Sequence, residues 1–202
     1  MEIKRINGHD PRFSRTVLLQ HGGFTVDGDP YEVEIISENE AVIRGDDPEY
    51  FPAVIDEFRF YAPHIVKFYD SAPKLIKAFQ DVEIVSIRIE EIQPSQFYVD
   101  REKIAAVSGF IEKPEDIIIQ AVRYGDRYIS LDGHTRLYYA VMKGWRSVRA
   151  VIGNDSEDWI YRFVGEAKKR GIFAPKDMIP LDHEEYEEKW IGFCDKFFAG
   201  NE

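Results

Sequence analysis

The spacing of apolar residues in the first part of the chain predicts a small sheet. Residues 16–45 contain short apolar segments separated by turn-forming residues: 17–19, 24–26, 31–36 and 41–43. In the third segment Tyr31, Val33 and Ile35 alternate with polar residues, which is typical of a half-buried strand. We therefore predict an N-terminal β-meander.

Apolar residues at helical spacing predict the helices that follow. Residues 48–61 place a set of apolar side chains on one helical face: Phe51, Val54, Ile55, Phe58 and Tyr61. Residues 73–79 are expected to add a short turn of helix before a strand at 84–89. Two amphipathic helices are predicted near the end of the chain, at 156–170 and 182–198. Acidic residues open the second of these, where they favour the helix dipole.

A strand that runs into a helix through an Asp-Gly turn is the most informative local pattern. Residues 128–131 are apolar and β-prone, Asp132 suits an N-cap, and Gly133 lets the backbone approach a ligand closely. The helix is predicted to start at about His134, where its first N–H groups and the helix dipole favour a phosphate. Arg136 adds a guanidinium that can hold phosphate oxygens in a fork. The alternative is an ordinary capped helix with a solvated Arg136.

The charge distribution favours a phosphate-binding turn over an ordinary capped helix. The chain carries a formal net charge of −11, yet residues 121–150 contain six basic residues and only two acidic ones. A local positive region on an acidic protein is expected to attract a small anion.

The order of elements from Ile89 to Ile152 resembles the ParB/sulfiredoxin-like fold. The resemblance lies in an Ile-Glu-Glu-Ile-Gln-Pro-Ser opening, a helix near 100–109, paired strands, Asp-Gly-His-Thr-Arg, and Lys-Gly-Trp before a closing strand. It implies phosphate binding at the turn, whose matching positions here are Gly133, His134, Thr135 and Arg136.

We accordingly predict an α+β protein in three parts. Residues 1–80 form the β-meander and its helix, 81–153 form a ParB/sulfiredoxin-like nucleotide-binding domain, and 154–202 form a helical segment packed on the core. Two branches of the family fit poorly. Sulfiredoxins carry a reactive cysteine at the turn, where this chain has His134, and the single cysteine, Cys194, lies among aromatic residues as an expected inert thiol.

ParB partition proteins are the second poor fit, because they carry two arginines at the turn, bind CTP and grip DNA. Here the second arginine is missing, and the C-terminal part contains an acidic run at 183–188. DNA binding draws much of its affinity from Lys and Arg that neutralise phosphates, so a role in DNA binding is disfavoured. A nuclease is disfavoured as well, since no cluster of metal-ligand carboxylates has a recognisable spacing.

The free serine kinases, whose turn reads Asp-Gly-His-His-Arg, give the best match. They phosphorylate free serine from ATP or ADP, which implies the same chemistry for Asp132-Gly-His-Thr-Arg136 with Thr135 replacing the second histidine. Their catalytic glutamate corresponds to Gln96, and an amide cannot accept a proton. The candidate bases are then Glu90, Glu91 and Asp132.

The resulting hypothesis is a phosphotransferase that binds ATP or ADP, with CTP as the alternative nucleotide. Mg²⁺ would bridge the phosphates, and the acceptor would be a small hydroxyl-bearing metabolite, serine first. The histidines form no i,i+4 pair, so no metal site of the protein's own is predicted. A non-catalytic nucleotide-responsive regulator is the competing hypothesis, and a ParB-like nucleic-acid-associated protein comes third.

Other features of the sequence bear on the cellular location and the oligomeric state of the protein. The sequence has no apolar run of membrane-spanning length and no signal peptide, and its single cysteine agrees with a reducing compartment, so we expect a cytoplasmic protein. The aromatic residues of the first part form core, a homodimer face or a pocket wall, which the sequence leaves open: Phe51, Phe58, Phe60, Tyr61, Phe68 and Tyr69. The acceptor, the base, the preferred nucleotide and the oligomeric state stay open too.

Overall fold

The computed structural model describes residues 1–6, 8, 10–153 and 157–199 and divides the chain into two compact units. Unit 1 is Met1–Glu83 and unit 2 is Ile84–Glu202. Both combine helices with sheet, so the chain is an α+β protein, as the sequence predicts. Each unit is described by itself.

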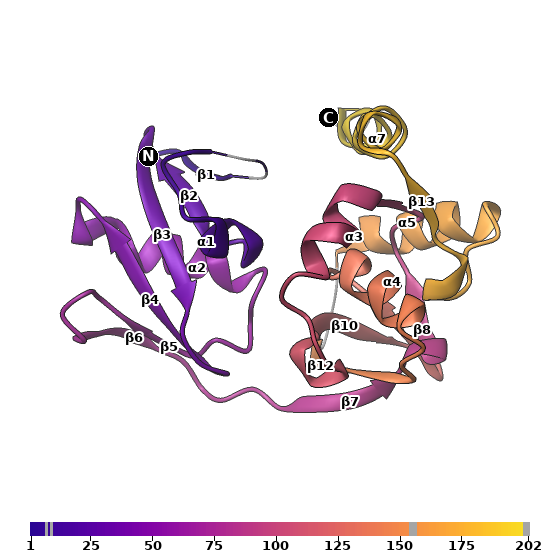
Figure 1. Cartoon of the computed structure of the whole chain (residues 1–202), viewed down its shortest axis with the longest axis horizontal. Helices are drawn as coiled ribbons and strands as arrows, with labels where there is room; N and C mark the ends of the chain where they lie inside the picture. Colours follow the sequence, from indigo (N-terminus) through magenta and orange to yellow (C-terminus); the bar gives the residue numbers. More distant parts are fainter. Residues whose placement is uncertain (7, 9, 154–156, 200–202) are drawn as a thin grey trace. The chain divides into compact units, whose positions relative to one another are not determined.

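Unit 1 is built on a sheet in which neighbouring strands follow the order of the chain (Figure 1). Its strands are β1 (Ile3–Arg5), β2 (Gly23–Val26), β3 (Asp29–Ile35), β4 (Glu40–Gly45), β5 (Lys67–Tyr69) and β6 (Leu75–Ala78). All neighbours are antiparallel except β4 and β5, which are parallel. A parallel pair needs a crossover, and helix α2 (Phe51–Arg59), preceded by a 3₁₀ turn at Pro48–Tyr50, supplies it.

The core of unit 1 lies between α2 and the sheet. The buried residues of α2 are four of the five predicted from helical spacing: Phe51, Val54, Ile55 and Phe58; the fifth, Tyr61, lies beyond the end of the helix and is partly buried. They belong to one apolar cluster with Tyr31, Val33 and Ile43 of the strands. The alternation predicted for β3 is confirmed, because Tyr31 and Val33 face this core.

Two local predictions in unit 1 are wrong. Residues 17–19 belong to a short helix, α1 (Arg15–Leu19), because Ser14 caps its start by accepting a hydrogen bond from the amide of Val17 at 3.2 Å. Residues 75–78 form strand β6 instead of a helical turn, because they pair with β5. In both cases hydrogen bonds outweigh the apolar pattern of a short segment.

Unit 2 contains a second sheet, of order β7-β12-β10-β11-β8. Its strands are β7 (Ile84–Arg88), β8 (Ile92–Pro94), β10 (Ile118–Tyr124), β11 (Arg127–Ser130) and β12 (Ser147–Gly153). A separate parallel pair joins β9 (Tyr98–Asp100) to β13 (Ile179–Leu181). The helices are α3 (Arg101–Val107), α4 (His134–Met142), α5 (Asp158–Lys169), α6 (His183–Tyr186) and α7 (Gly192–Ala199).

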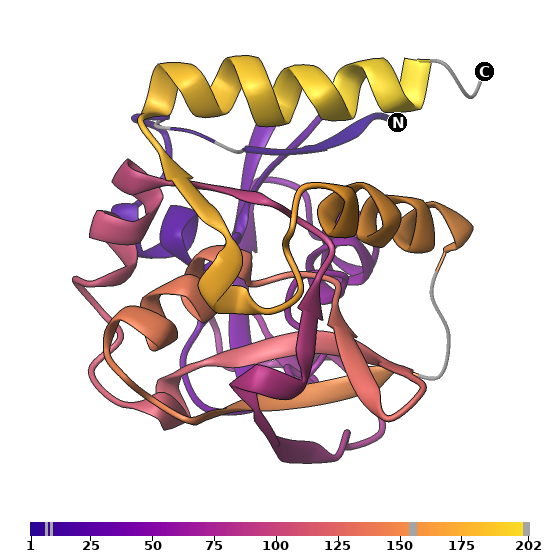
Figure 2. The same cartoon turned by 90° about the vertical axis from the view of Figure 1, so that its right-hand side faces the viewer.

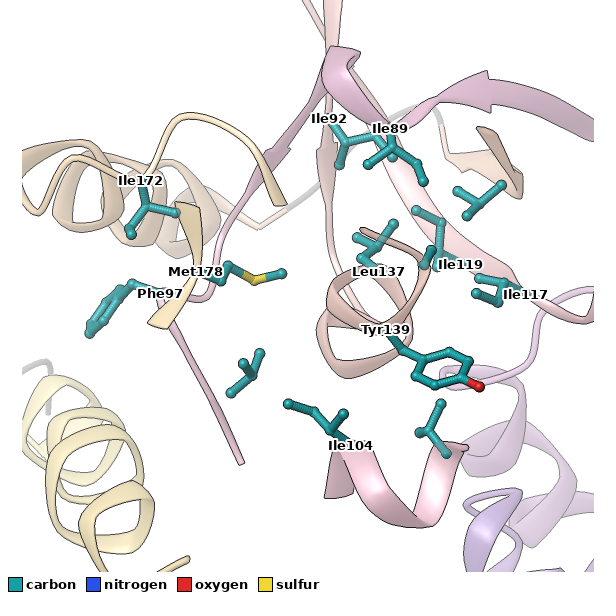
Figure 3. Close-up of a cluster of buried hydrophobic side chains, with 14 of the residues drawn as sticks. Ile89, Ile92, Phe97, Ile104, Ile117, Ile119, Leu137, Tyr139, Ile172 and Met178 are labelled. Atoms are coloured by element: carbon teal, nitrogen blue, oxygen red, sulfur yellow. The ribbon is translucent and has the colours of Figure 1, made fainter. Parts of the chain in front are cut away.

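Helices cover both faces of this sheet because its central strands are apolar on both sides. Leu137 of α4 and Ile104 of α3 share a cluster with Ile119 of β10 (Figure 3). Ile160 of α5 instead packs with Val122, which points to the other face of the same strand. Helix α4 is thereby anchored along its length, which fixes the position of its first turn.

The C-terminal segment packs on this core through aromatic side chains. The two helices predicted there are confirmed, the second being continuous through α6, a π-helical turn at Glu187–Ile191, and α7 (Figure 2). Trp190 is buried, with its ring centroid 4.8 Å from that of Phe97. Cys194 is partly buried, and desolvation raises the pKa of its thiol to about 11, which fits an inert residue.

Candidate functional site

The predicted phosphate-binding turn lies at the carboxyl end of β11, where the chain passes into α4. We call residues 131–136 the elbow. The parallel neighbour β8 ends beside it, since Ser130 pairs with Pro94 in the sheet. Adjacent strands are about 4.8 Å apart, so the loop after β8, which contains Ser95 and Gln96, borders the elbow.

Gly133 gives the elbow its shape. Its φ angle is +81°, in the left-handed region that favours glycine. A Cβ at this position would lie 2.7 Å from Cγ2 of Ile119 and 3.2 Å from Nη2 of Arg136. The sequence prediction that Asp132 caps α4 is wrong, because Gly133 occupies the N-cap and no N-cap side chain bonds the first turn among the described residues.

Asp132 is drawn away from the cap by Arg136. Nη2 of Arg136 lies 2.7 Å from Oδ2 of Asp132, and its Nη1 donates to the carbonyl of Ile118 at 2.8 Å. The two charged side chains are 19% and 29% exposed, so the pair is mostly shielded from water. A phosphate at the elbow would therefore meet a guanidinium that is already oriented and partly neutralised.

The buried imidazole of His134 connects the elbow to the loop after β8 through hydrogen bonds. Its Nε2 lies 3.1 Å from the hydroxyls of both Ser95 and Ser130 and 3.3 Å from the amide nitrogen of Gln96. Since a backbone amide can only donate, Nε2 accepts and the ring is neutral. Burial lowers the pKa of His134 to about 4. The ring thus holds the loop, while the backbone of His134 remains part of the helix start.

The side chain of Gln96 ties this loop to the C-terminal segment. Its Nε2 donates to the carbonyl of Tyr98 and, at 3.4 Å, to the hydroxyl of Tyr186 in α6. Burial raises the pKa of Tyr186, which keeps its hydroxyl protonated. Sequence reasoning singled out Gln96 but missed Ser95, Ser130 and Tyr186. Ser95 adjoins Gln96 in the sequence and was within reach, whereas Tyr186 is ninety residues away from Gln96.

Glu90 and Glu91 do not reach the elbow. They lie in a 3₁₀ turn (Ile89–Glu91) before β8, whereas the elbow lies beyond the end of β11. Because β8 and β11 are parallel, the glutamates are at the opposite end of the strands, about 10 Å away at 3.3 Å per residue. Both carboxylates are near Arg88. Of the three predicted bases, only Asp132 lies at the elbow.

Two of the basic residues in 121–150 make their contacts away from the elbow. The Arg127 guanidinium donates to the carbonyls of Ile92 and Phe173, at 3.3 and 2.6 Å, and so fastens β8 and the loop after α5. The Arg123 guanidinium lies 5.6 Å from the ring centre of Tyr128. Arg136 is the basic side chain that the elbow itself carries.

The described residues offer Mg²⁺ no complete set of ligands. They contain no group of three or more His, Cys, Asp or Glu side chains able to hold a metal ion. Mg²⁺ commonly arrives with nucleotide phosphates and uses one or two carboxylates. Asp132 is a carboxylate in the right place for that use, so the elbow fits an ion brought by the ligand.

A groove of about 600 Å³ lies elsewhere in unit 2, between α5 and α7. It is lined by Arg162, Gly165, Glu166, Lys169, Phe193 and Phe197. None of these is an elbow residue. In the described part of the chain, no helix is long and apolar enough to cross a membrane.

Comparison with known proteins gives similarity in structure only. No protein-family model and no curated protein matches the chain. A crystal structure of an Agrobacterium tumefaciens protein matches 48% of this chain and 62% of its own, with 15% identity and a TM-score of 0.36. Sulfiredoxin from Arabidopsis thaliana matches 41% of this chain and 97% of its own, with 15% identity and a TM-score of 0.32.

A free serine kinase variant in complex with AMP is also similar. It matches 39% of this chain but only 34% of the kinase, with 25% identity and a TM-score of 0.31. Each of these TM-scores is below 0.5. Solved structures of two kinds of protein that the sequence resembles, a sulfiredoxin and a free serine kinase, are thus similar to part of this chain.

Proposed function

We propose that unit 2 binds the phosphate groups of a nucleotide at residues 133–136 of the elbow. The observation that carries this proposal is the start of α4. Gly133 occupies the N-cap without a side chain, so the amides of the first turn lack the usual capping acceptor. These amides and the helix dipole together favour an anion.

Arg136 strengthens the site because it is held in place and still has donors to offer. A guanidinium carries five N–H groups. Those of Arg136 make two hydrogen bonds, to Ile118 and Asp132, within the described chain. Three N–H groups therefore remain for phosphate oxygens, and the two existing bonds limit the rotamer entropy lost on binding.

The proposed reaction is transfer of a phosphoryl group from ATP or ADP to a small hydroxyl-bearing metabolite, with serine as the first acceptor to test. Mg²⁺, when bound with the nucleotide beside Asp132, would neutralise phosphate charge. The chain itself contributes the helix-start amides and the Arg136 guanidinium, which position the phosphates. The second candidate is a regulator that binds nucleotide without catalysis, and Gln96 favours it because an amide cannot act as a base.

Thermal stability measured with increasing ATP, ADP or CTP, each with Mg²⁺, tests the binding step. A ligand at about 100 times its Kd stabilises by roughly 2.7 kcal/mol, so the melting temperature should rise with nucleotide concentration. Arg136→Ala should abolish that rise. Arg146→Ala is the matched control, since Arg146 is an exposed arginine just beyond the same helix. An equal rise in both variants would place the nucleotide elsewhere.

A product assay then separates the two candidates. The protein is incubated with ATP or ADP, Mg²⁺ and an amino-acid mixture, and phosphorylated products are sought by mass spectrometry. A phosphorylated amino acid supports the kinase. Stabilisation by nucleotide without any product supports the regulator.

A further inference from the structure

A second polar feature of unit 2 is a histidine held by a buried carboxylate. Nδ1 of His183, the first residue of α6, lies 2.8 Å from Oδ2 of Asp100. The Asp100 side chain is 0% exposed and that of His183 is 48% exposed. The other carboxylate oxygen, Oδ1, accepts from the amide of Glu102 at 2.8 Å and caps α3. Asp100 is thus fixed on both sides, and it is Nδ1 of His183, not Nε2, that faces its carboxylate.

Contacts lead from this pair to the elbow. Tyr186 follows His183 by three residues, on the same side of α6, and its hydroxyl lies 3.4 Å from Nε2 of Gln96. The amide of Gln96 in turn donates to His134. From Gln96 to Asp100 the chain advances four residues, so their Cα atoms are at most about 14 Å apart. The pair is therefore within reach of a ligand that extends from the elbow past Gln96 and along β9.

The helix that carries His183 is distorted next to it. A π-helical turn, Glu187–Ile191, begins directly after Tyr186. Such turns are rare and are frequently found at functional sites. Here the turn separates two roles of one helix, because Trp190 packs into the aromatic core while the preceding turn faces β9.

The proposed phosphoryl transfer lacks a base at the elbow. Gln96 is an amide, and Asp132 is paired with Arg136. The ring of His134 is buried and its Nε2 already accepts a hydrogen bond. An accessible imidazole backed by a buried carboxylate is the arrangement that general-base catalysis uses.

We infer that His183 is the general base of the transfer and that Asp100 is its positioning residue, an inference that rests on the proposed function. Nε2 of His183 takes the proton of the acceptor hydroxyl as the hydroxyl oxygen forms a bond to the terminal phosphorus. The bond from that phosphorus to the bridging oxygen breaks, and the shortened nucleotide leaves with its electron pair. The imidazolium then returns the proton to solvent.

The surroundings of His183 set the pH dependence. The hydrogen bond to Asp100 raises the pKa of His183, and Glu102 and Glu187 act in the same direction. The nearby cation, Lys103, lies over the ring of Tyr186, 4.6 Å from its centre. A base must be neutral to accept a proton, so kcat/KM should rise with pH through a midpoint above the ordinary value of about 6.5.

Two variants and one control test the inference on the full chain, with ATP or ADP, Mg²⁺ and serine. His183→Asn should lower kcat by about 100-fold or more while leaving the nucleotide-induced rise in melting temperature intact. Asp100→Asn keeps a capping side chain for α3 but removes the charge, so the midpoint of the pH profile should move to lower pH. Glu184→Gln changes an exposed neighbour in the same turn and should alter neither kcat nor the midpoint of the pH profile.

The outcomes separate this inference from the proposed function. If the wild-type chain is not stabilised by nucleotide, the proposed function fails and the inference fails with it. If it is stabilised but forms no product, nucleotide binding stands, while the proposed transfer and this inference both fail. If product forms and His183→Asn transfers at the rate of Glu184→Gln, only the inference is overturned. An unshifted midpoint in Asp100→Asn would assign Asp100 a capping role alone.

Discussion

Replacing Gly133 by alanine tests the geometry on which the elbow depends. Two costs add at this position. A non-glycine residue in the left-handed region costs about 1–2 kcal/mol, and forcing a methyl group into a packed core costs about 1–3 kcal/mol. The second cost applies because the new Cβ would lie 2.7 Å from Cγ2 of Ile119, which is 1% exposed and held in β10. We expect Gly133→Ala to lose about 2–5 kcal/mol in the free energy of unfolding.

A second glycine isolates the steric part of that loss. Gly125 has a φ of +64°, and a Cβ there would meet nothing within 4 Å. Gly125→Ala should therefore lose only the backbone cost, about 1–2 kcal/mol. Urea unfolding followed by tryptophan fluorescence measures both variants, and it reports on unit 2 because every tryptophan lies there: Trp145, Trp159 and Trp190. Equal losses in the two variants would refute the close approach of Gly133 to Ile119.

Two further predictions concern charge at the elbow. Folding lowers the pKa of His134 from an ordinary value of about 6.5 to about 4. As the pH drops, the unfolded state therefore binds the proton before the folded state does. The free energy of unfolding should fall by about 3 kcal/mol in total between these two pH values. Urea unfolding of wild type and His134→Gln between pH 7 and pH 4 checks this, and parallel curves would contradict it. Asp132→Asn should strengthen nucleotide binding without Mg²⁺ by about tenfold, because it removes a carboxylate that repels phosphate. Thermal shifts with ATP and EDTA measure it, and an unchanged shift would mean that the phosphates do not lie beside Asp132.

Local signals in the sequence were sufficient to place the elbow. The glycine, the apolar strand before it and the helical spacing after it all act over a few residues, so the β11–α4 junction was predicted correctly. The error at Asp132 came from a competition between two local interactions. Its carboxylate could cap the helix or pair with Arg136, four residues later, and the structure has the ion pair.

Partners distant in the sequence account for what could not be predicted. Arg127 is one of the basic residues that make the net charge of residues 121–150 positive. Its guanidinium, however, donates hydrogen bonds to carbonyls 35 and 46 residues away in the sequence. His183 and Asp100 are 83 residues apart, and the parallel pairing of β13 with β9 brings them together. Composition and periodicity contain no information about such pairings, so the net charge of a sequence window is a weak guide to a binding surface.

In the described part of the chain, the start of α4 leaves its first-turn amides without a capping side chain. Helix starts are commonly capped by Ser, Thr, Asp or Asn, and such a cap contributes about 1 kcal/mol. Here the candidate cap, Asp132, instead fixes the guanidinium of Arg136, and the N-cap is a glycine in the left-handed region packed against Ile119. A side chain at this position would meet Ile119, so the first-turn amides cannot be capped from here and are left to another acceptor. The arrangement is therefore better suited to an external anion that completes the helix start than to a closed structural turn.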